Sequence, residues 1–236
     1  MGLAKCHAGV SRAVDTSYRT ENVHVIYLHG FASSPASSKA MFLKNRLLAH
    51  GVTFNCPDLN QPDFATMTVS RMVKEVQAII DLLPEGPVVL CGSSLGAFVA
   101  LHASDCVSRR IDQLILLAPA FDFGRRPVGD LGEEGMARWK DEGWWTFTHY
   151  ATAQSQRVHY ELFRDATEYD SFGIRSIVPT LIIQGRYDTV VDPKMVERFS
   201  ATRPHVDLVM VDDDHQLGAS LERIWDEIVR CLSIVT

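Results

Sequence analysis

Short apolar runs alternate with segments of helical periodicity along most of the chain. The apolar, β-rich runs predict strands at Val23–Leu28, Val52–Cys56, Val88–Cys91, Leu114–Ala118, Leu181–Ile183 and Val206–Val211. Helical spacing of apolar residues predicts helices near Lys39–His50, Val69–Leu83, Leu95–Ala103, Pro193–Ala201 and Leu217–Leu232. Strands that alternate with helices indicate an α/β domain with a mostly parallel central sheet flanked by helices.

The alternation stops between Pro119 and Val178. No strong strand pattern occurs there, and aromatic residues, including Trp139, Trp144 and Trp145, gather among charged ones. Because a structureless loop of this length is unusual in a compact domain, residues 121–177 are predicted to form a helical cap inserted into a single domain that spans residues 1–236. We expect Trp144 and Trp145 either to line a substrate pocket or merely to pack the cap against the sheet.

Composition and charge narrow the classes of function. The 236 residues are 46% hydrophobic and 22% charged, as in one soluble globular domain. A net charge of -6 without a Lys/Arg cluster argues against a nucleic-acid partner. Residues 1–21 lack the apolar stretch of a secretory signal, and no run reaches the about 18 residues that span a membrane. Five scattered cysteines without metal-ligand spacing predict free thiols, no metal site and a cytoplasmic location.

A candidate nucleophile lies between the third predicted strand and the helix that follows it. Gly92-Ser93-Ser94-Leu95-Gly96 matches the pattern G-x-S-x-G, and the strand-turn-helix context is the one that this motif requires. Glycines are needed on both sides because side chains two residues from the serine would collide with the neighbouring strand and helix. The spacing of the glycines selects Ser94 over Ser93.

A serine hydroxyl needs a base, and His215 is the best candidate. It follows the last predicted strand, after Asp212-Asp213-Asp214, where the later loops of an α/β sheet deliver a histidine. The carboxylate that orients the imidazole should lie between serine and histidine in chain order, which favours Asp188, just after the strand at Leu181–Ile183. Asp122 is the rival, since it also follows a strand.

Asp192 has a separate explanation as the N-cap of a helix whose first residue is Pro193.

The negative charge of a tetrahedral intermediate needs fixed hydrogen-bond donors. In this arrangement they are the amide after the nucleophile, here that of Leu95, and one from the early strand-to-helix loop, here that of Phe31 or Ala32.

The chain resembles the α/β-hydrolase superfamily from Val23 to its last helix. The resemblance depends on His29-Gly30-Phe31, the motif around Ser94, Gly185 to Asp188 and Asp214-His215. The segment from Leu28 to Pro35, together with that motif, resembles the small esterase-like hydrolases of the YqiA type, from which the longer Trp-rich insertion departs. This resemblance implies hydrolysis of a small carboxylic ester or thioester without a cofactor.

The expected function is therefore a serine esterase that works through an acyl-enzyme. Acyl transfer or lyase chemistry on the same three residues is an alternative, because fold and triad do not determine the acceptor. The other alternative is a non-catalytic binding protein that has this fold.

Overall fold

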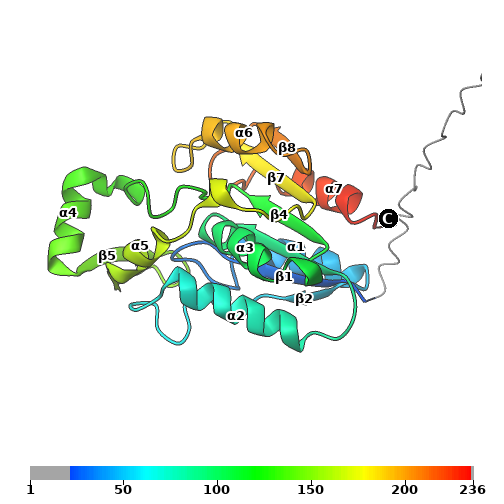
Figure 1. The fold of residues 1–236 in the computed structure, drawn as a ribbon, viewed down its shortest axis with the longest axis horizontal. Coiled ribbons are helices and arrows are strands. Elements are labelled where there is room, and N and C mark those ends of the chain that lie inside the picture. The colour runs from blue at the N-terminus through cyan, green and yellow to red at the C-terminus, as the bar shows by residue number, and fades with distance from the viewer. Residues whose placement is uncertain (1–21, 235–236) are drawn as a thin grey trace, which may run out of the picture.

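The computed structural model describes residues 22–234 and is built on a six-stranded parallel sheet. Its strands are β1 (His24–Leu28), β2 (Thr53–Asn55), β3 (Val88–Ser93), β4 (Gln113–Leu117), β7 (Thr180–Gly185) and β8 (Val206–Val211). They lie in the order β2-β1-β3-β4-β7-β8, and all neighbours are parallel (Figure 1). The predicted sheet is confirmed. The expectations for residues 1–21, which include Cys6, lie outside the described residues.

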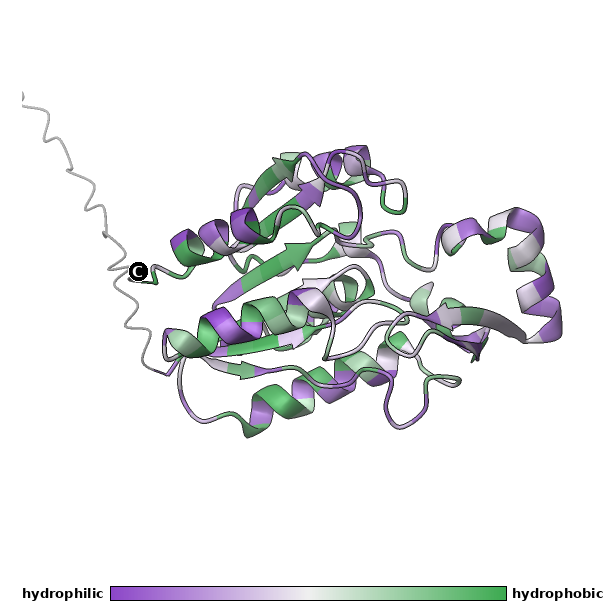
Figure 2. Ribbon diagram, turned by 180° about the vertical axis from the view of Figure 1, so that it is seen from behind, coloured by the Kyte–Doolittle hydropathy of each residue, from purple (hydrophilic) through white to green (hydrophobic). Residues whose placement is uncertain are grey.

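Different helices cover the two faces of the sheet. They are α1 (Ser38–Ala49), α2 (Val69–Leu82), α3 (Leu95–Cys106), α6 (Pro193–Ala201) and α7 (Leu221–Cys231). In β1, Ile26 and Leu28 join the core beneath α2, α3 and α6, whereas Val25 and Tyr27 join the core beneath α1 and α7. Burial on both faces explains why the inner strands β1, β3, β4 and β7 are mostly apolar runs, which stand out among the more polar helices in Figure 2.

The helices begin where side chains can satisfy their free amides. The Ser37 and Thr68 hydroxyls accept hydrogen bonds from the first turns of α1 and α2. Asp192 caps α6, with Pro193 at its first position, so that prediction is confirmed. The last helix, α7, starts at Leu221 rather than at the expected Leu217, because residues 217–220 form a turn in which the Ser220 amide donates to the Leu217 carbonyl.

The insertion after β4 contains the expected helices and a hairpin that was not predicted. Its regular elements are α4 (Gly132–Glu142), β5 (Trp144–His149), β6 (Gln154–His159) and α5 (Glu161–Ala166), and β5 and β6 pair antiparallel. Thr146 and Thr148 are exposed while the alternate residues Trp145, Phe147 and His149 are covered. This period-2 pattern was present in the sequence, but charged neighbours obscured it. The insertion, called the cap below, projects as a separate lobe (Figure 1).

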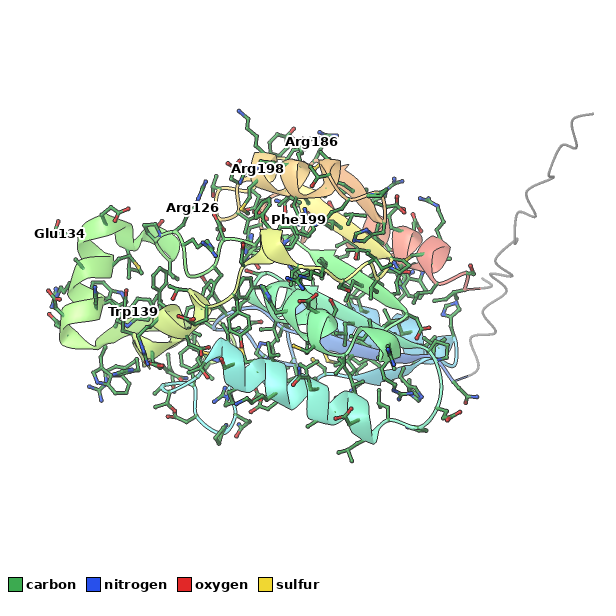
Figure 3. The ribbon with its side chains drawn as sticks, viewed as in Figure 1. Arg126, Glu134, Trp139, Arg186, Arg198 and Phe199 are labelled. Carbon is green, nitrogen blue, oxygen red and sulfur yellow. The ribbon has the colours of Figure 1, made fainter. Side chains whose placement is uncertain are left out.

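The cap has its own small core around Trp139. Trp139 belongs to α4, and its side chain packs against the hairpin (Figure 3). It is 0% exposed and donates its indole N–H to the Val158 carbonyl of β6 at 2.9 Å. The rings of Phe147 and Tyr160 lie against it at 5.2 and 5.5 Å between centroids. Such aromatic packing holds helix and hairpin together as a unit.

In residues 22–234, no helix combines the length and hydropathy required to cross a bilayer. The four cysteines in this part of the chain are free thiols.

Candidate active site

Ser94 occupies a sharp turn between β3 and α3. Its backbone has φ 54° and ψ −116°, a conformation that is strained for a residue with a side chain. The turn is held from both sides: the Ser94 amide donates to the Leu117 carbonyl of β4 at 2.9 Å, and the Ser94 carbonyl accepts from the amides of Ala97 and Phe98. The nucleophile candidate is thus presented at the carboxyl end of the sheet on a rigid turn.

The two glycines of the motif are there because of close packing. A Cβ on Gly92 would lie 2.4 Å from the Gly96 carbonyl oxygen, and a Cβ on Gly96 would lie 2.0 Å from that of Leu28. The adjacent Ser93 belongs to β3 and is buried. Ser94 is therefore the more accessible of the two serines.

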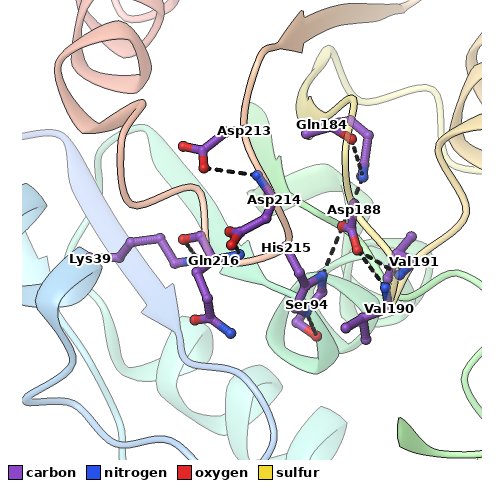
Figure 4. A network of polar contacts seen from close by, with 11 residues as sticks. Lys39, Ser94, Gln184, Asp188, Val190, Val191, Asp213, Asp214, His215 and Gln216 are labelled. Atoms are coloured by element: carbon purple, nitrogen blue, oxygen red, sulfur yellow. Dashed lines mark hydrogen bonds and ion pairs between the residues drawn. The ribbon is translucent and has the colours of Figure 1, made fainter. Parts of the chain in front are cut away.

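A hydrogen-bonded chain joins Ser94, His215 and Asp188 (Figure 4). His215 Nε2 lies 3.0 Å from Ser94 Oγ, and His215 Nδ1 lies 2.8 Å from Asp188 Oδ2. With its proton on Nδ1, the imidazole donates to Asp188 and leaves Nε2 free to accept the hydroxyl proton of Ser94. In the sequence, Ser94 lies 121 positions before His215, and Asp188 lies 27 positions before it. Ser94 follows β3, Asp188 follows β7 and His215 follows β8.

Asp188 is buried and yet remains ionised. Burial raises its pKa, but hydrogen bonds from His215, the Val191 amide and Gln184 outweigh this effect and bring the pKa below its ordinary value. The carboxylate is fully used: Oδ2 accepts from His215 Nδ1 and from Gln184 Nε2 at 2.9 Å, and Oδ1 accepts from the amides of Val190 and Val191 at 2.8 Å each. Gln184, the supporting residue, was not singled out in the sequence.

The rival carboxylate, Asp122, has another partner. Its Oδ2 lies 2.8 Å from Nε of Arg126, four residues later in the loop after β4. Burial raises the pKa of Asp122, and Arg126 only partly opposes this. The structure brings Asp188, and not Asp122, to the imidazole of His215.

The predicted oxyanion donors gather around Ser94. Leu95 is the first residue of α3, so its amide has no acceptor within the helix. The loop after β1 passes close to the nucleophile, because a Cβ on Gly30 would lie 3.4 Å from that of Ser94. Ala32 follows in this loop with φ 53°, in the left-handed region. Gly30 thus lies beside the nucleophile and Leu95 directly follows it, while the donor roles of Phe31, Ala32 and Leu95 remain predictions.

His29 shapes this loop from inside the protein. It is 1% exposed, with Nδ1 2.9 Å from the Gly30 carbonyl and Nε2 accepting the Leu59 amide at 3.0 Å. Burial lowers the pKa of His29, so the ring is neutral and donates from Nδ1. Its role in the structure is to hold the turn at Gly30.

The cap touches the same loop through residues that the sequence did not point to. The Tyr150 amide, just after β5, donates to the Ala32 carbonyl at 2.8 Å. The ring of Phe31 stacks on Phe64 at 5.7 Å between centroids and meets Phe147 of β5 edge-on at 4.9 Å. The hairpin thus supports the loop that carries two of the expected oxyanion donors.

The two candidate pocket tryptophans make their aromatic and cation–π contacts within the cap. Trp144 packs against His159 of β6 at 4.7 Å between centroids and lies beneath the guanidinium of Arg157. Trp145 lies near the guanidinium of Arg138 on α4. Both side chains are half-buried. These contacts fit packing, and a role in a substrate pocket remains a prediction.

Known proteins share this architecture and part of the sequence. The chain is 27% identical over 175 residues to mouse palmitoyl-protein thioesterase ABHD10, a match that covers 71% of this chain and 59% of that protein. The bovine protein of the same name is also 27% identical, over 156 residues, and there the match spans only 49% of the relative's length.

Solved structures show the same fold. Mouse alpha/beta hydrolase domain-containing protein 10 superposes with a TM-score of 0.73 at 24% identity, covering 89% of both chains. A hydrolase from Agrobacterium vitis superposes with a TM-score of 0.78 at 24% identity and covers 90% of this chain and 88% of that one. Est1E from Butyrivibrio proteoclasticus, solved with ferulic acid bound, has a TM-score of 0.76 at 18% identity and covers 92% of each.

The fold is thus that of the α/β hydrolases, as expected. The profile of the uncharacterised protein family UPF0227 matches residues 24–232, and the chain belongs to that family.

Proposed function

We propose that this protein is a serine hydrolase that cleaves carboxylic esters, including thioesters, through an acyl-enzyme. The observation that carries the proposal is the chain of hydrogen bonds from Ser94 Oγ through His215 to Asp188, on a turn that strains the serine backbone. Support also comes from a relative described as a palmitoyl-protein thioesterase and from a similar fold solved with ferulic acid bound.

In the first half of the reaction, Ser94 Oγ attacks the carbonyl carbon while His215 Nε2 takes the hydroxyl proton. The carbonyl oxygen becomes an oxyanion, which the amides of Leu95 and of Phe31 or Ala32 stabilise. Collapse of this intermediate breaks the bond to the alcohol or thiol, which leaves with the proton from His215. The acyl group stays on Ser94.

The second half repeats these steps with water. His215 takes a proton from water, the hydroxide attacks the acyl carbon, and Ser94 leaves with the proton that His215 returns. Asp188 stays ionised throughout, since its hydrogen bonds lower its pKa, and it stabilises the imidazolium that forms in each half.

Labelling by a fluorophosphonate, followed by mass spectrometry, tests the proposal. The folded protein should be labelled on Ser94 and should hydrolyse a panel of nitrophenyl esters and acyl-thioesters. Ser94→Ala should lose both activities, while Ser93→Ala, the matched control one residue away, should keep a measurable part of each. A parent protein that is folded but neither labelled nor active contradicts the proposal, as does labelling that survives in Ser94→Ala.

A further inference from the structure

Lys39 reaches from the first turn of α1 to the loop that carries His215. Its Nζ donates to the carbonyl oxygen of Gln216, the residue after His215, at 2.7 Å (Figure 4). The two residues are 177 positions apart in the sequence, so only the fold brings them together. The mechanism above makes no use of this lysine.

Three aspartates lie close enough to the Lys39 ammonium to affect its pKa. Burial lowers the pKa of Lys39 to about 8, while Asp213 and Asp214 of the His215 loop and Asp188 after β7 act in the opposite direction. The Cys91 thiol of β3 also acts to raise this pKa. With a pKa of about 8, the lysine is still mostly charged at neutral pH.

Asp213 is the strongest of these acidic neighbours and is itself poorly satisfied. It is 9% exposed, and Oδ1 accepts the Asp214 amide at 2.8 Å. Its Oδ2 is buried and has no hydrogen-bond partner among the described residues. The nearby Asp212 instead pairs with Arg186, at 3.1 Å. Among the described residues Lys39 forms no ion pair with Asp213 within 4.0 Å, so the attraction between the two charges acts over a longer distance.

The opposite side of the loop is held by the end of β7. The Tyr187 amide donates to the Asp213 carbonyl at 3.0 Å, and the Arg186 amide donates to that of Val211 at 2.8 Å. The backbones are so close that a Cβ on Gly185 would lie 2.5 Å from the carbonyl oxygens of Asp213 and Asp214. The loop thus has a rigid support on the β7 side, and Lys39 contacts it from the α1 side.

We propose that Lys39 is a positioning residue, which holds the loop of residues 212–217 from the α1 side and so keeps the imidazole of His215 in reach of Ser94. The inference rests on the proposed function. Charge-assisted hydrogen bonds are roughly twice as strong as neutral ones, so a neutral Lys39 holds the Gln216 carbonyl less firmly. Turnover should therefore fall as pH rises through about 8, where Lys39 loses its proton.

Three variants and two measurements test this role. Lys39→Met removes the charge, Lys39→Arg keeps a charge that does not titrate in this range, and Lys44→Met makes the same change at an exposed position of α1. Hydrogen exchange of residues 212–220, corrected for the intrinsic effect of pH, reports on the loop without any need for activity. The rate of fluorophosphonate labelling of Ser94 across pH reports on the triad.

Lys39→Met should increase exchange in the loop and slow labelling by about ten- to a hundredfold, because small displacements of a reacting group can cost about 100-fold. Lys39→Arg should restore most of the labelling rate and move its alkaline decline to higher pH. Lys44→Met should match the parent in both measurements.

Unchanged loop exchange in Lys39→Met overturns the inference, whether or not the protein is a hydrolase. Labelling at the parent rate overturns it also, even if the variant melts earlier, since Lys39 would then only stabilise the fold. If Lys39→Met does not fold, the comparison of Lys39→Arg with the parent decides. The inference is overturned if the rate of Ser94 labelling declines at the same alkaline pH in both proteins. A parent protein that is not labelled at all rejects the proposed function, and loop exchange then decides the role of Lys39 alone.

Discussion

Replacing Asp188 by Asn removes the charge from a carboxylate that accepts four hydrogen bonds. The donors are His215 Nδ1 and Gln184 Nε2 at Oδ2, and the amides of Val190 and Val191 at Oδ1. An asparagine has one acceptor oxygen, so in either orientation its NH₂ group faces two donors. With the NH₂ toward His215, the imidazole has to accept at Nδ1 and to carry its proton on Nε2. It then cannot take the proton of the nucleophile.

The size of the effect follows from these contacts. In a well-studied protease triad the same change lowers kcat by about 10⁴, and we expect a loss of at least about 100-fold for Asp188→Asn. In this orientation of the asparagine, Gln184 Nε2 also loses its acceptor on residue 188, and one buried donor left without it should lower the free energy of unfolding by about 1–3 kcal/mol. The structure therefore adds a stability cost to the catalytic one.

The assay is kcat for a nitrophenyl ester, measured well below the melting temperature of each variant, with thermal melting recorded in parallel. Asp122→Asn is the matched control: it removes a half-exposed ion pair with Arg126, worth about 0–1 kcal/mol, and should leave kcat nearly unchanged. The reasoning is refuted if folded Asp188→Asn turns over like the parent, or if Asp122→Asn is the variant that loses activity.

Other predictions probe the turn, the cap and the base. Gly96→Ala should fail to fold, since its Cβ would lie 2.0 Å from a β1 carbonyl; circular dichroism of a normally folded variant would contradict this. Phe147→Ala should lower the free energy of unfolding by about 1–3 kcal/mol and slow the hydrolysis of acetyl and long-chain esters alike, because the Phe147 ring supports Phe31. Slower hydrolysis of long-chain esters alone argues against that support. Trp144→Ala should change selectivity among acyl and aryl esters by about 1–3 kcal/mol, whereas equal losses on all esters with a lower melting temperature indicate packing only. Activity should fall in acid, because a protonated imidazole cannot act as the base; a rate that stays flat down to about pH 5 excludes a histidine base.

The succession of strands and helices along the chain and the local turn at Ser94 could be predicted because both depend on short-range patterns. Apolar runs such as Leu181–Ile183 indicate strands buried on two faces, and Asp192-Pro193 indicates the start of a helix. The spacing of the glycines around Ser94 can be recognised within five consecutive residues, although a side chain at Gly96 would collide with Leu28 of β1. The cap hairpin was not predicted, because the alternation in β5 is short and lies among charged residues.

The contacts that complete the candidate site depend on the tertiary structure. Strand-end position and chain order favoured Asp188 over Asp122 but could not say which carboxylate meets the imidazole of His215, since both follow strands of the same sheet. In the same way, no local pattern joins Lys39 to the carbonyl of Gln216 or the cap hairpin to the loop at Ala32. Local sequence determined the strands, the helices and the turn that presents Ser94, because propensity and packing act over a few residues. Only the folded chain decided which side chains from distant loops meet, because the order of the strands places those loops at one edge of the sheet.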